Sequence, residues 1–447
     1  MRHKSSPSRA LRLSLGALSL PLAAWACTAP NATYEACQAH PEACAPLEVC
    51  DGEDQDLDGQ VDEGLDAPCV STHPGYFTVS AGFGRAIVPI PDINGDGADE
   101  LFVSSAPARA ALDEASPESG TVFLLSSTDA DLLWAQERPN AFGSQLAAAD
   151  LNGDGELELV ASMPLGDSES ASGLFVFNAA GELVSRVRAE APEGRAGFGR
   201  ALAVGHAPTG EVALITSEPS WEPSSGGAPR AGRLLGFTFD ADLSPQLSFS
   251  YEGEEGQRLG ERLTAIPDND GDGVDDIMTT AWSDEGGEAQ RQVWILSGAT
   301  GRGLKRFSSP EETSGTLGEG LAVAPFAADG ATALAFSAPR SLSGAGQERG
   351  RLFVLTPEGE SLGSLIHEGE FGATLLSARL GERDVLLVGG RGRLYIVSDS
   401  RELVASVTLA ADEVPTLAAA TRPDPDGRTS VWVGLPGVGR IYTLKVR

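Results

Sequence analysis

The sequence predicts an all-β repeat protein, and three observations support this. A segment that opens with Phe or Leu followed by Gly returns along the chain at intervals of 54 to 61 residues, and a last copy without that pair follows after 45 residues. A short β-type run, in most cases led by glycine, follows each copy. The 447 residues include 54 Gly and 28 Pro, which favours turns over long helices. Short apolar runs and turns repeating at this interval are typical of a β-propeller or a solenoid.

The first copy is the most complete. It opens at Phe83-Gly84, passes through a loop rich in Asp and Gly, and closes at Ala106-Pro107. We expect its strands at residues 86–90, 101–104, 121–126 and 132–136. Later copies open at Phe142-Gly143, Phe198-Gly199, Leu259-Gly260, Leu317-Gly318 and Phe371-Gly372, and a seventh near Thr416-Leu417 has lost the opening pair.

The β-type runs give an independent count of the copies. Six of them begin with glycine, at Gly120, Gly173, Gly232, Gly350, Gly392 and Gly439. The fourth copy instead has a run that begins at Gln292. Seven openings and seven runs predict seven blades.

The two ends of the chain predict how the ring closes. The seventh copy stops after its third strand, residues 440–445. Residues 76–80 lie just before the first Phe-Gly pair, where every other fourth strand lies. We expect this N-terminal strand to pair beside the C-terminal strand, because closure removes the open edges that invite aggregation.

These copies resemble the FG-GAP repeat of integrin α-subunit head domains, which is named for its Phe-Gly opening and Gly-Ala-Pro close. The resemblance covers residues 75–447, which we predict to form one domain. It implies a seven-bladed β-propeller with four antiparallel strands in each blade. It also implies ion-binding loops between two strands on one face of the ring, and partner-binding loops on the other face.

Three copies carry a loop that could hold a hard cation. Oxygen-bearing residues stand at loop positions 1, 3, 5 and 9, and the carbonyl at position 7 is a further ligand. The three predicted sets are Asp92, Asn94, Asp96, Ala98 and Glu100; Asp150, Asn152, Asp154, Glu156 and Glu158; and Asp268, Asp270, Asp272, Val274 and Asp276. Ligation by oxygen alone favours Ca²⁺ over a transition metal, so we predict about three calcium ions in the propeller. The alternative is that these Asn-Gly and Asp-Gly pairs are empty hairpin turns. Glu at position 9 of two loops departs from the Asp that is usual in the family.

The first residues predict export from the cell. Residues 1–26 contain a basic stretch and then an apolar stretch too short to span a bilayer comfortably, as in a signal peptide. Small residues before Cys27 resemble the lipidation site of bacterial lipoproteins, although Ala24 stands where Leu is usual. The alternative is ordinary cleavage after Ala26. We therefore predict an outer-membrane or cell-surface lipoprotein, or otherwise a periplasmic or secreted protein, whose membrane contact is through lipid alone.

Residues 27–74 predict a small acidic module held together by disulfides or metal. This segment contains eleven Asp or Glu and no Lys or Arg. Once Cys27 is lipidated, two disulfides can form among the remaining cysteines, Cys37, Cys44, Cys50 and Cys69. One further calcium loop is predicted at Asp54, Asp56, Asp58, Asp62 and Glu63. It resembles a metal-binding motif found near the start of secreted bacterial proteins, with Leu57 where that motif often has Cys. The alternative is a solvated acidic tether.

Charge and motifs exclude several function classes. The formal net charge is −32, and acidic residues outnumber basic ones by 64 to 32, which argues against a nucleic-acid-binding protein. The sequence has no Gly-x-Ser-x-Gly nucleophile motif and no Walker loop, and its histidines lie far apart. We therefore do not expect an enzyme.

A binding role fits the sequence better. The loops between second and third strands vary most in length, and Trp221 and Trp282 lie in or beside two of them. Exposed aromatic side chains anchor proteins and stack on sugars, although either Trp could instead pack between blades. We expect a monomeric, non-enzymatic module for adhesion or protein interaction at the bacterial cell surface. The alternative is a glycan-binding lectin or an accessory domain of a system that degrades extracellular polymers.

Overall fold

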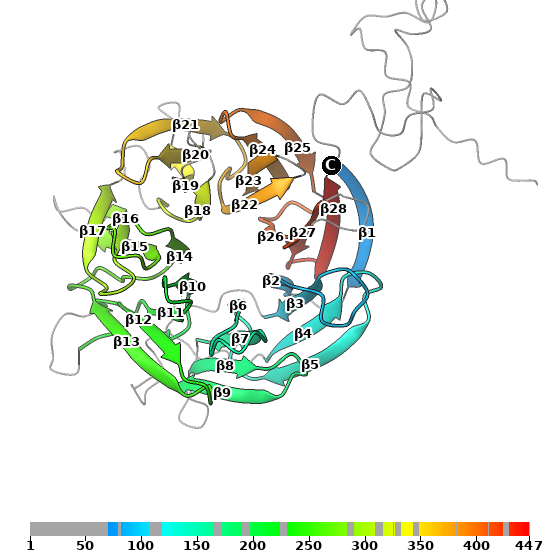
Figure 1. Ribbon diagram of the computed structural model, residues 1–447. Coiled ribbons are helices and arrows are strands. Elements are labelled where there is room, and N and C mark those ends of the chain that lie inside the picture. The colour runs from blue at the N-terminus through cyan, green and yellow to red at the C-terminus, as the bar shows by residue number, and fades with distance from the viewer. Residues whose placement is uncertain are drawn as a thin grey trace, which may run out of the picture. The chain divides into compact units, whose positions relative to one another are not determined.

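The computed structural model describes residues 70–78, 82–106, 119–164, 172–188, 197–223, 230–283, 290–308, 316–324, 326, 332–342, 348–380, 383–409, 411–422 and 429–446. Every regular element in these residues is a β-strand, and the strands form seven four-stranded antiparallel sheets. The predicted all-β seven-bladed propeller is confirmed (Figure 1). Within these ranges the chain has no helix with the length and apolar character needed to span a bilayer.

Blades 1 to 6 are each built from four strands that follow one another in sequence from the centre of the ring to its rim. Blades 1 to 3 consist of β2 (Phe83–Ile90), β3 (Glu100–Ser105), β4 (Gly120–Ser126) and β5 (Leu132–Arg138); β6 (Leu146–Ala149), β7 (Glu158–Met163), β8 (Gly173–Phe177) and β9 (Leu183–Arg188); and β10 (Leu202–His206), β11 (Val212–Glu218), β12 (Arg233–Phe239) and β13 (Pro245–Glu252). Blades 4 to 6 consist of β14 (Leu263–Ile266), β15 (Asp276–Ser283), β16 (Gln290–Leu296) and β17 (Gly303–Ser308); β18 (Leu321–Ala324), β19 (Ala333–Leu342), β20 (Glu348–Leu355) and β21 (Ser361–His367); and β22 (Thr374–Leu380), β23 (Arg383–Gly390), β24 (Arg393–Ser398) and β25 (Leu403–Thr408).

Blade 7 joins the two ends of the propeller. It consists of β26 (Thr416–Ala419), β27 (Thr429–Leu435), β28 (Arg440–Val446) and, at the rim, β1 (Val70–Thr78). β1 pairs antiparallel with β28, with Phe77 opposite Ile441, so the predicted ring closure is confirmed. The strand begins six residues earlier than predicted, because a register shift between His73 and Phe77 absorbs Pro74 and Gly75. An edge strand tolerates such an irregularity, since proline there need not donate to the ladder.

The hydrophobic core consists of seven clusters, each between two neighbouring blades. Phe142 of the Phe-Gly pair illustrates the packing. It is fully buried and clusters with Phe102 of blade 1 and Phe175 of blade 2, and its ring meets the Phe175 ring edge to face at 5.4 Å. The Phe-Gly pair is therefore the point where one blade locks onto the one before it.

The glycine of the pair has both a conformational and a packing role. Gly143 has φ 81°, and a Cβ there would lie 2.8 Å from Val122 and 3.0 Å from the Ser104 Cβ, both in blade 1. Ser104 itself accepts a hydrogen bond from the Ala86 N–H over 3.1 Å. The blade interface thus leaves no room for a side chain at this position.

The chain separates into two units, Met1–Leu65 and Asp66–Arg447. Residues 1–69 lie outside the described residues. The predicted signal peptide, the lipidation at Cys27, the disulfides and the N-terminal calcium loop therefore remain predictions. The same holds for most of the loops between second and third strands, including residues 107–118, 165–171, 224–229, 284–289 and 343–347.

Candidate functional site

The three predicted ion loops occupy equivalent places in the fold. Each joins the first strand of a blade to the second: residues 91–99 join β2 to β3, residues 150–157 join β6 to β7, and residues 267–275 join β14 to β15. Because the first strands all run in the same sense around the centre of the ring, the three loops lie on one face. The structure therefore places the predicted ligands of each loop together, in blades 1, 2 and 4.

One hydrogen-bond pattern recurs in all three loops. The Asp at position 1 accepts the backbone N–H groups of the glycines at positions 4 and 6. For Asp92 these bonds are 2.6 and 3.0 Å, for Asp150 they are 2.7 and 2.8 Å, and for Asp268 they are 2.7 and 2.8 Å. These hydrogen bonds bend the loop around the carboxylate, as a wrapped cation loop requires.

Positions 3 and 5 continue the pattern. The side chain at position 3 accepts the N–H of position 5, and the Asp at position 5 accepts the N–H of position 7. The position-5 bonds run from Ala98 to Asp96 (2.8 Å), from Glu156 to Asp154 (2.8 Å) and from Val274 to Asp272 (2.9 Å). In blades 1 and 4 a serine at the end of the third strand, Ser126, or directly after it, Ser297, also donates to the second oxygen of the position-5 Asp, over 3.3 and 3.4 Å.

The acid at position 9 begins the second strand and is buried in each loop. Glu100 and Asp276 are fully buried, and Glu158 is 4% exposed. Each accepts the N–H of position 2, over 2.7 Å from Ile93, 2.8 Å from Leu151 and 2.8 Å from Asn269. Within the described residues no Lys or Arg pairs with any of the three acids, and the Oε1 atom of Glu100 is buried with no hydrogen-bond partner there.

The pKa values of the buried position-9 acids are raised. Burial raises the pKa of Glu100 and of Glu158, and it raises the pKa of Asp276 to about 6. The charges of Asp268 and Asp270 add to the effect at Asp276. By contrast, the backbone hydrogen bonds lower the pKa of Asp92 and Asp268 at position 1. The loops of blades 1 and 4 therefore combine a position-1 carboxylate whose ionised form is favoured by backbone hydrogen bonds with a buried position-9 carboxylate that pairs with no Lys or Arg of the described residues.

The distances between carboxylate oxygens distinguish the loops of blades 1 and 4 from that of blade 2. One carboxylate oxygen each from Asp92, Asp96 and Glu100, and one each from Asp268, Asp270 and Asp276, lie within 4.8 Å of one another. Two ligands of one calcium ion are at most about 5 Å apart, so these two groups fit such an ion. The fully described loop of blade 2 forms no such group of three acids. The loops of blades 1 and 4 are thus the better formed candidates.

Position 8 has a role that sequence analysis missed. Asp99 accepts hydrogen bonds from the N–H and the hydroxyl of Thr421, both 2.8 Å, and pairs with Arg422 at 3.2 Å. Asp275 accepts from the N–H of His206 over 3.0 Å. In both cases the donor lies at the end of the first strand of the preceding blade or just after it. The sequence does show two adjacent acids at positions 8 and 9 of these loops. The hydrogen-bond partner of the position-8 acid, however, depends on how the blades are arranged in the ring.

The two tryptophans proposed as ligand anchors are partly buried. The ring of Trp221 packs under Arg233, whose Cζ lies 5.0 Å from the ring centroid. Trp282 lies in β15, and its indole Nε1 is buried without a hydrogen-bond partner in the described part of the chain. Neither belongs to the large hydrophobic side chains that are most exposed there.

Comparison with known proteins agrees with this architecture. The profile of the FG-GAP repeat family matches residues 142–177, which span the Phe-Gly pair, the ion loop and the third strand of blade 2. The chain carries an FG-GAP repeat on a seven-bladed propeller. The resemblance inferred from the Phe-Gly openings is thereby confirmed. A search of curated protein sequences finds no match.

Solved structures resemble this propeller at low sequence identity. A crystal structure of BBS1N in complex with ARL6DN, soaked with mercury, has a TM-score of 0.52 and 11% identity, and covers 86% of this chain and 98% of that one. The same complex soaked with lead has a TM-score of 0.50 and 10% identity, and covers 86% and 97%. A rhamnogalacturonan lyase, YesX, has a TM-score of 0.46 and 13% identity, and covers 84% and 75%.

Proposed function

We propose that this protein is a calcium-stabilised, non-catalytic FG-GAP propeller that binds a protein partner at the bacterial cell surface. The observation that carries the calcium assignment is the buried position-9 acid. Glu100 and Asp276 each lie fully buried beside two further carboxylates, and no Lys or Arg of the described residues pairs with either of them. In blade 1 the neighbouring Asp92 pairs with Arg422 at 3.4 Å, so part of the loop's charge is compensated while that of Glu100 is not. Isolated buried charge is costly, and a divalent ion in the loop would remove that cost.

The hydrogen-bond pattern that the loops share indicates which residues would hold calcium. Asp92, Asp96 and Glu100 would supply oxygens in blade 1, and Asp268, Asp270 and Asp276 would do so in blade 4. Backbone hydrogen bonds already fix the position-1 Asp in each loop, so little ordering remains to oppose binding. The bound ion would pin the first hairpin of the blade and stabilise the ring.

Titration calorimetry with Ca²⁺ tests this assignment. We expect saturable binding to the wild-type protein, and the loss of one site in Asp268→Asn. Asp240→Asn is the matched control, because Asp240 also accepts backbone N–H groups in a turn, from Asp242 and Ser244, but stands outside any ion loop. Equal binding by both variants would reject the role of Asp268.

The protein-binding role is tested separately. BBS1N, which has a similar fold, is described in complex with ARL6DN, and we extend protein binding to this chain by analogy. The signal peptide and Cys27 support an exported and lipid-anchored location. Mass spectrometry of the mature N-terminus tests the anchor, and an unmodified Cys27 would reject it. Binding to purified surface proteins, compared with a glycan array, separates a protein partner from the lectin alternative.

A further inference from the structure

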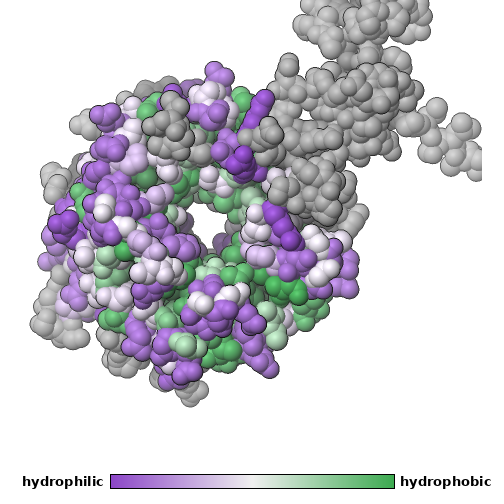
Figure 2. Space-filling model, in the orientation of Figure 1, coloured by the Kyte–Doolittle hydropathy of each residue, from purple (hydrophilic) through white to green (hydrophobic). Residues whose placement is uncertain are grey.

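A cavity of about 540 Å³ lies at the centre of the ring. Its lining comes mainly from the beginnings of the first strands, in the residues that directly follow each Phe-Gly pair. The ion loops follow the opposite ends of the same strands, so the cavity opens on the other face. Figure 2 shows the ring hollowed at its centre.

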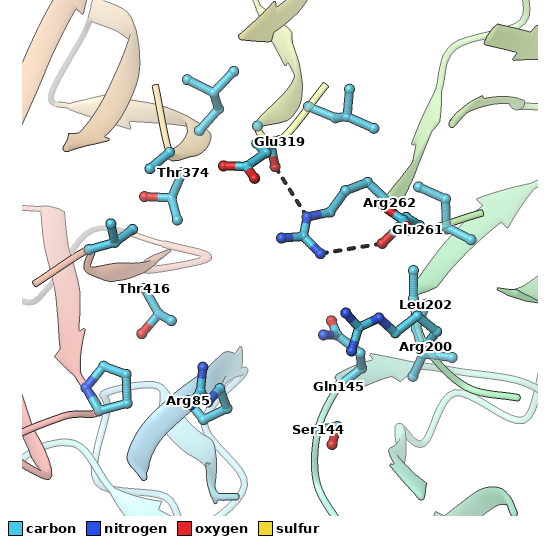
Figure 3. A pocket seen from close by; sticks show the side chains of 18 of the residues that line it. Arg85, Ser144, Gln145, Arg200, Leu202, Glu261, Arg262, Glu319, Thr374 and Thr416 are labelled. Carbon is cyan, nitrogen blue, oxygen red and sulfur yellow. Dashed lines mark hydrogen bonds between the residues drawn. The ribbon is translucent and has the colours of Figure 1, made fainter. Parts of the chain in front are cut away.

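Arginines from three blades reach into this cavity. Arg85, Arg200 and Arg262 line it, and Figure 3 shows the three side chains directed toward the same space. Arg262 donates from Nε to the Glu319 carbonyl (3.2 Å) and from Nη1 to the Glu261 carbonyl (3.3 Å), which are uncharged acceptors. The remaining polar lining includes Gln145 and Thr374.

Arg85 is held there without a close counter-charge. Its Nε is buried with no hydrogen-bond partner among the described residues. Burial lowers the pKa of the guanidinium, and the charge of Glu413 offsets this in part. The Glu413 carboxylate itself accepts the backbone N–H groups of Gly437 (2.6 Å) and Val438 (3.3 Å). An anion in the cavity would compensate Arg85 directly.

The three glutamates that line the cavity are each already paired with another arginine. Glu261 pairs with Arg258 at 2.7 Å, Glu319 with Arg340 at 3.0 Å, and Glu370 with Arg391 at 3.0 Å. In the described part of the chain no ion pair joins Arg85 or Arg262 to a carboxylate. The local charge of the cavity is therefore positive on a chain whose net charge is −32.

The side chains that line the cavity favour a carboxylate ligand over a sugar. It contains no Phe, Tyr, Trp or His, so it lacks the aromatic surface on which sugars and drug-sized ligands usually pack. Guanidinium groups recognise carboxylates through paired, directional hydrogen bonds. The cavity volume exceeds the needs of a single small anion and leaves room for part of a peptide.

We propose that this arginine pocket, formed by Arg85, Arg200 and Arg262, binds a carboxylate of an acidic peptide segment in the protein partner. This inference rests on the proposed protein-binding function and names the chemistry of the partner. The net charge of −32 on the whole chain would repel other acidic proteins, so only a segment that reaches the pocket gains from it. Binding should weaken as salt rises.

Fluorescence anisotropy with a labelled poly-glutamate peptide tests the proposal on the mature full-length protein. We expect saturable binding to the wild type, and binding at least about tenfold weaker in Arg85→Gln, the scale of one lost charge-assisted hydrogen bond. The matched control is Arg302→Gln, because Arg302 is an exposed turn residue of blade 4 with the same charge change. A poly-glutamine peptide should not bind.

Several results would overturn the proposal. These are equal affinity of Arg85→Gln and the wild type, no binding of the peptide, or binding of an oligogalacturonide or inorganic phosphate in its place. Melting curves of both variants are measured first, so that a folding defect is not read as lost binding. If surface proteins still bind Arg85→Gln as they bind the wild type, the arginine pocket is rejected while the protein-binding function stands.

Discussion

Glu100 accepts a hydrogen bond from the backbone N–H of Ile93 over 2.7 Å, while its second carboxylate oxygen is buried without a partner among the described residues. The same pairing of positions 9 and 2 recurs as Glu158 with Leu151 and as Asp276 with Asn269. A carboxylate held in this way is destabilising unless a cation neutralises it. The calcium assignment therefore predicts that this carboxylate lowers the stability of the metal-free protein and raises the stability of the calcium-bound protein.

Glu100→Gln should reduce the stabilisation that calcium gives to blade 1. The amide oxygen can still accept from Ile93, and the variant buries no charge. We expect a higher melting temperature than wild type in the presence of chelator, and a smaller gain on adding Ca²⁺. Differential scanning fluorimetry measures both. A variant that loses stability in chelator and keeps the full calcium gain would contradict the assignment.

The stability gained from calcium should depend on pH. Burial raises the pKa of Asp276 from 3.8 to about 6, so between these values this carboxyl binds more protons in the folded metal-free protein than in the unfolded chain. The contribution of Asp276 to stability in chelator should therefore fall as pH rises from about 4 to about 6. Calcium competes with protons for the same carboxylate, so the gain in melting temperature from Ca²⁺ should grow over this range. A gain that is constant with pH would contradict a role for Asp276 as a ligand.

The Phe-Gly glycine should be intolerant of any side chain. Gly143→Ala combines an unfavourable positive φ with contacts of 2.8 Å to Val122 and 3.0 Å to Ser104. The matched control is Gly210→Ala, because Gly210 has φ 82° and open space around it. The control should cost about 1–2 kcal/mol, and Gly143→Ala should cost about 1–3 kcal/mol more. Chemical denaturation measures the difference, and equal costs would contradict the blade-locking role.

Ring closure should depend on the N-terminal strand. A mature protein that begins at residue 79 lacks β1 and leaves β28 as an open edge. We expect a lower melting temperature and aggregation on heating, because an unpaired edge recruits other chains. A protein that begins at residue 66 keeps β1 and is the control. Identical melting of the two proteins would contradict the closure.

The sequence predicted the blade count, the strands of blade 1 and the closing strand because each of these repeats in the chain. The Phe-Gly pair, such as Phe142-Gly143, and the Asp-rich loop stand at the same positions in every copy that retains the full motif. Contacts between blades were not predictable in the same way. Asp99 accepts a hydrogen bond from Thr421 only because the ring brings blades 1 and 7 together. Arg85 and Arg262 line one cavity for the same reason, although they are far apart in the sequence. Residue types that are far apart in sequence give no signal for such convergence.

The most direct test of the calcium assignment is a calorimetric melt of the wild-type protein with Ca²⁺ and with excess chelator. Each filled site stabilises the folded state by about 2.7 kcal/mol when Ca²⁺ is at a hundred times its dissociation constant. We predict a melting temperature that rises with Ca²⁺ concentration and returns to its lower value in chelator. Superimposable melts across that range would contradict the assignment and leave the three loops as empty hairpin turns.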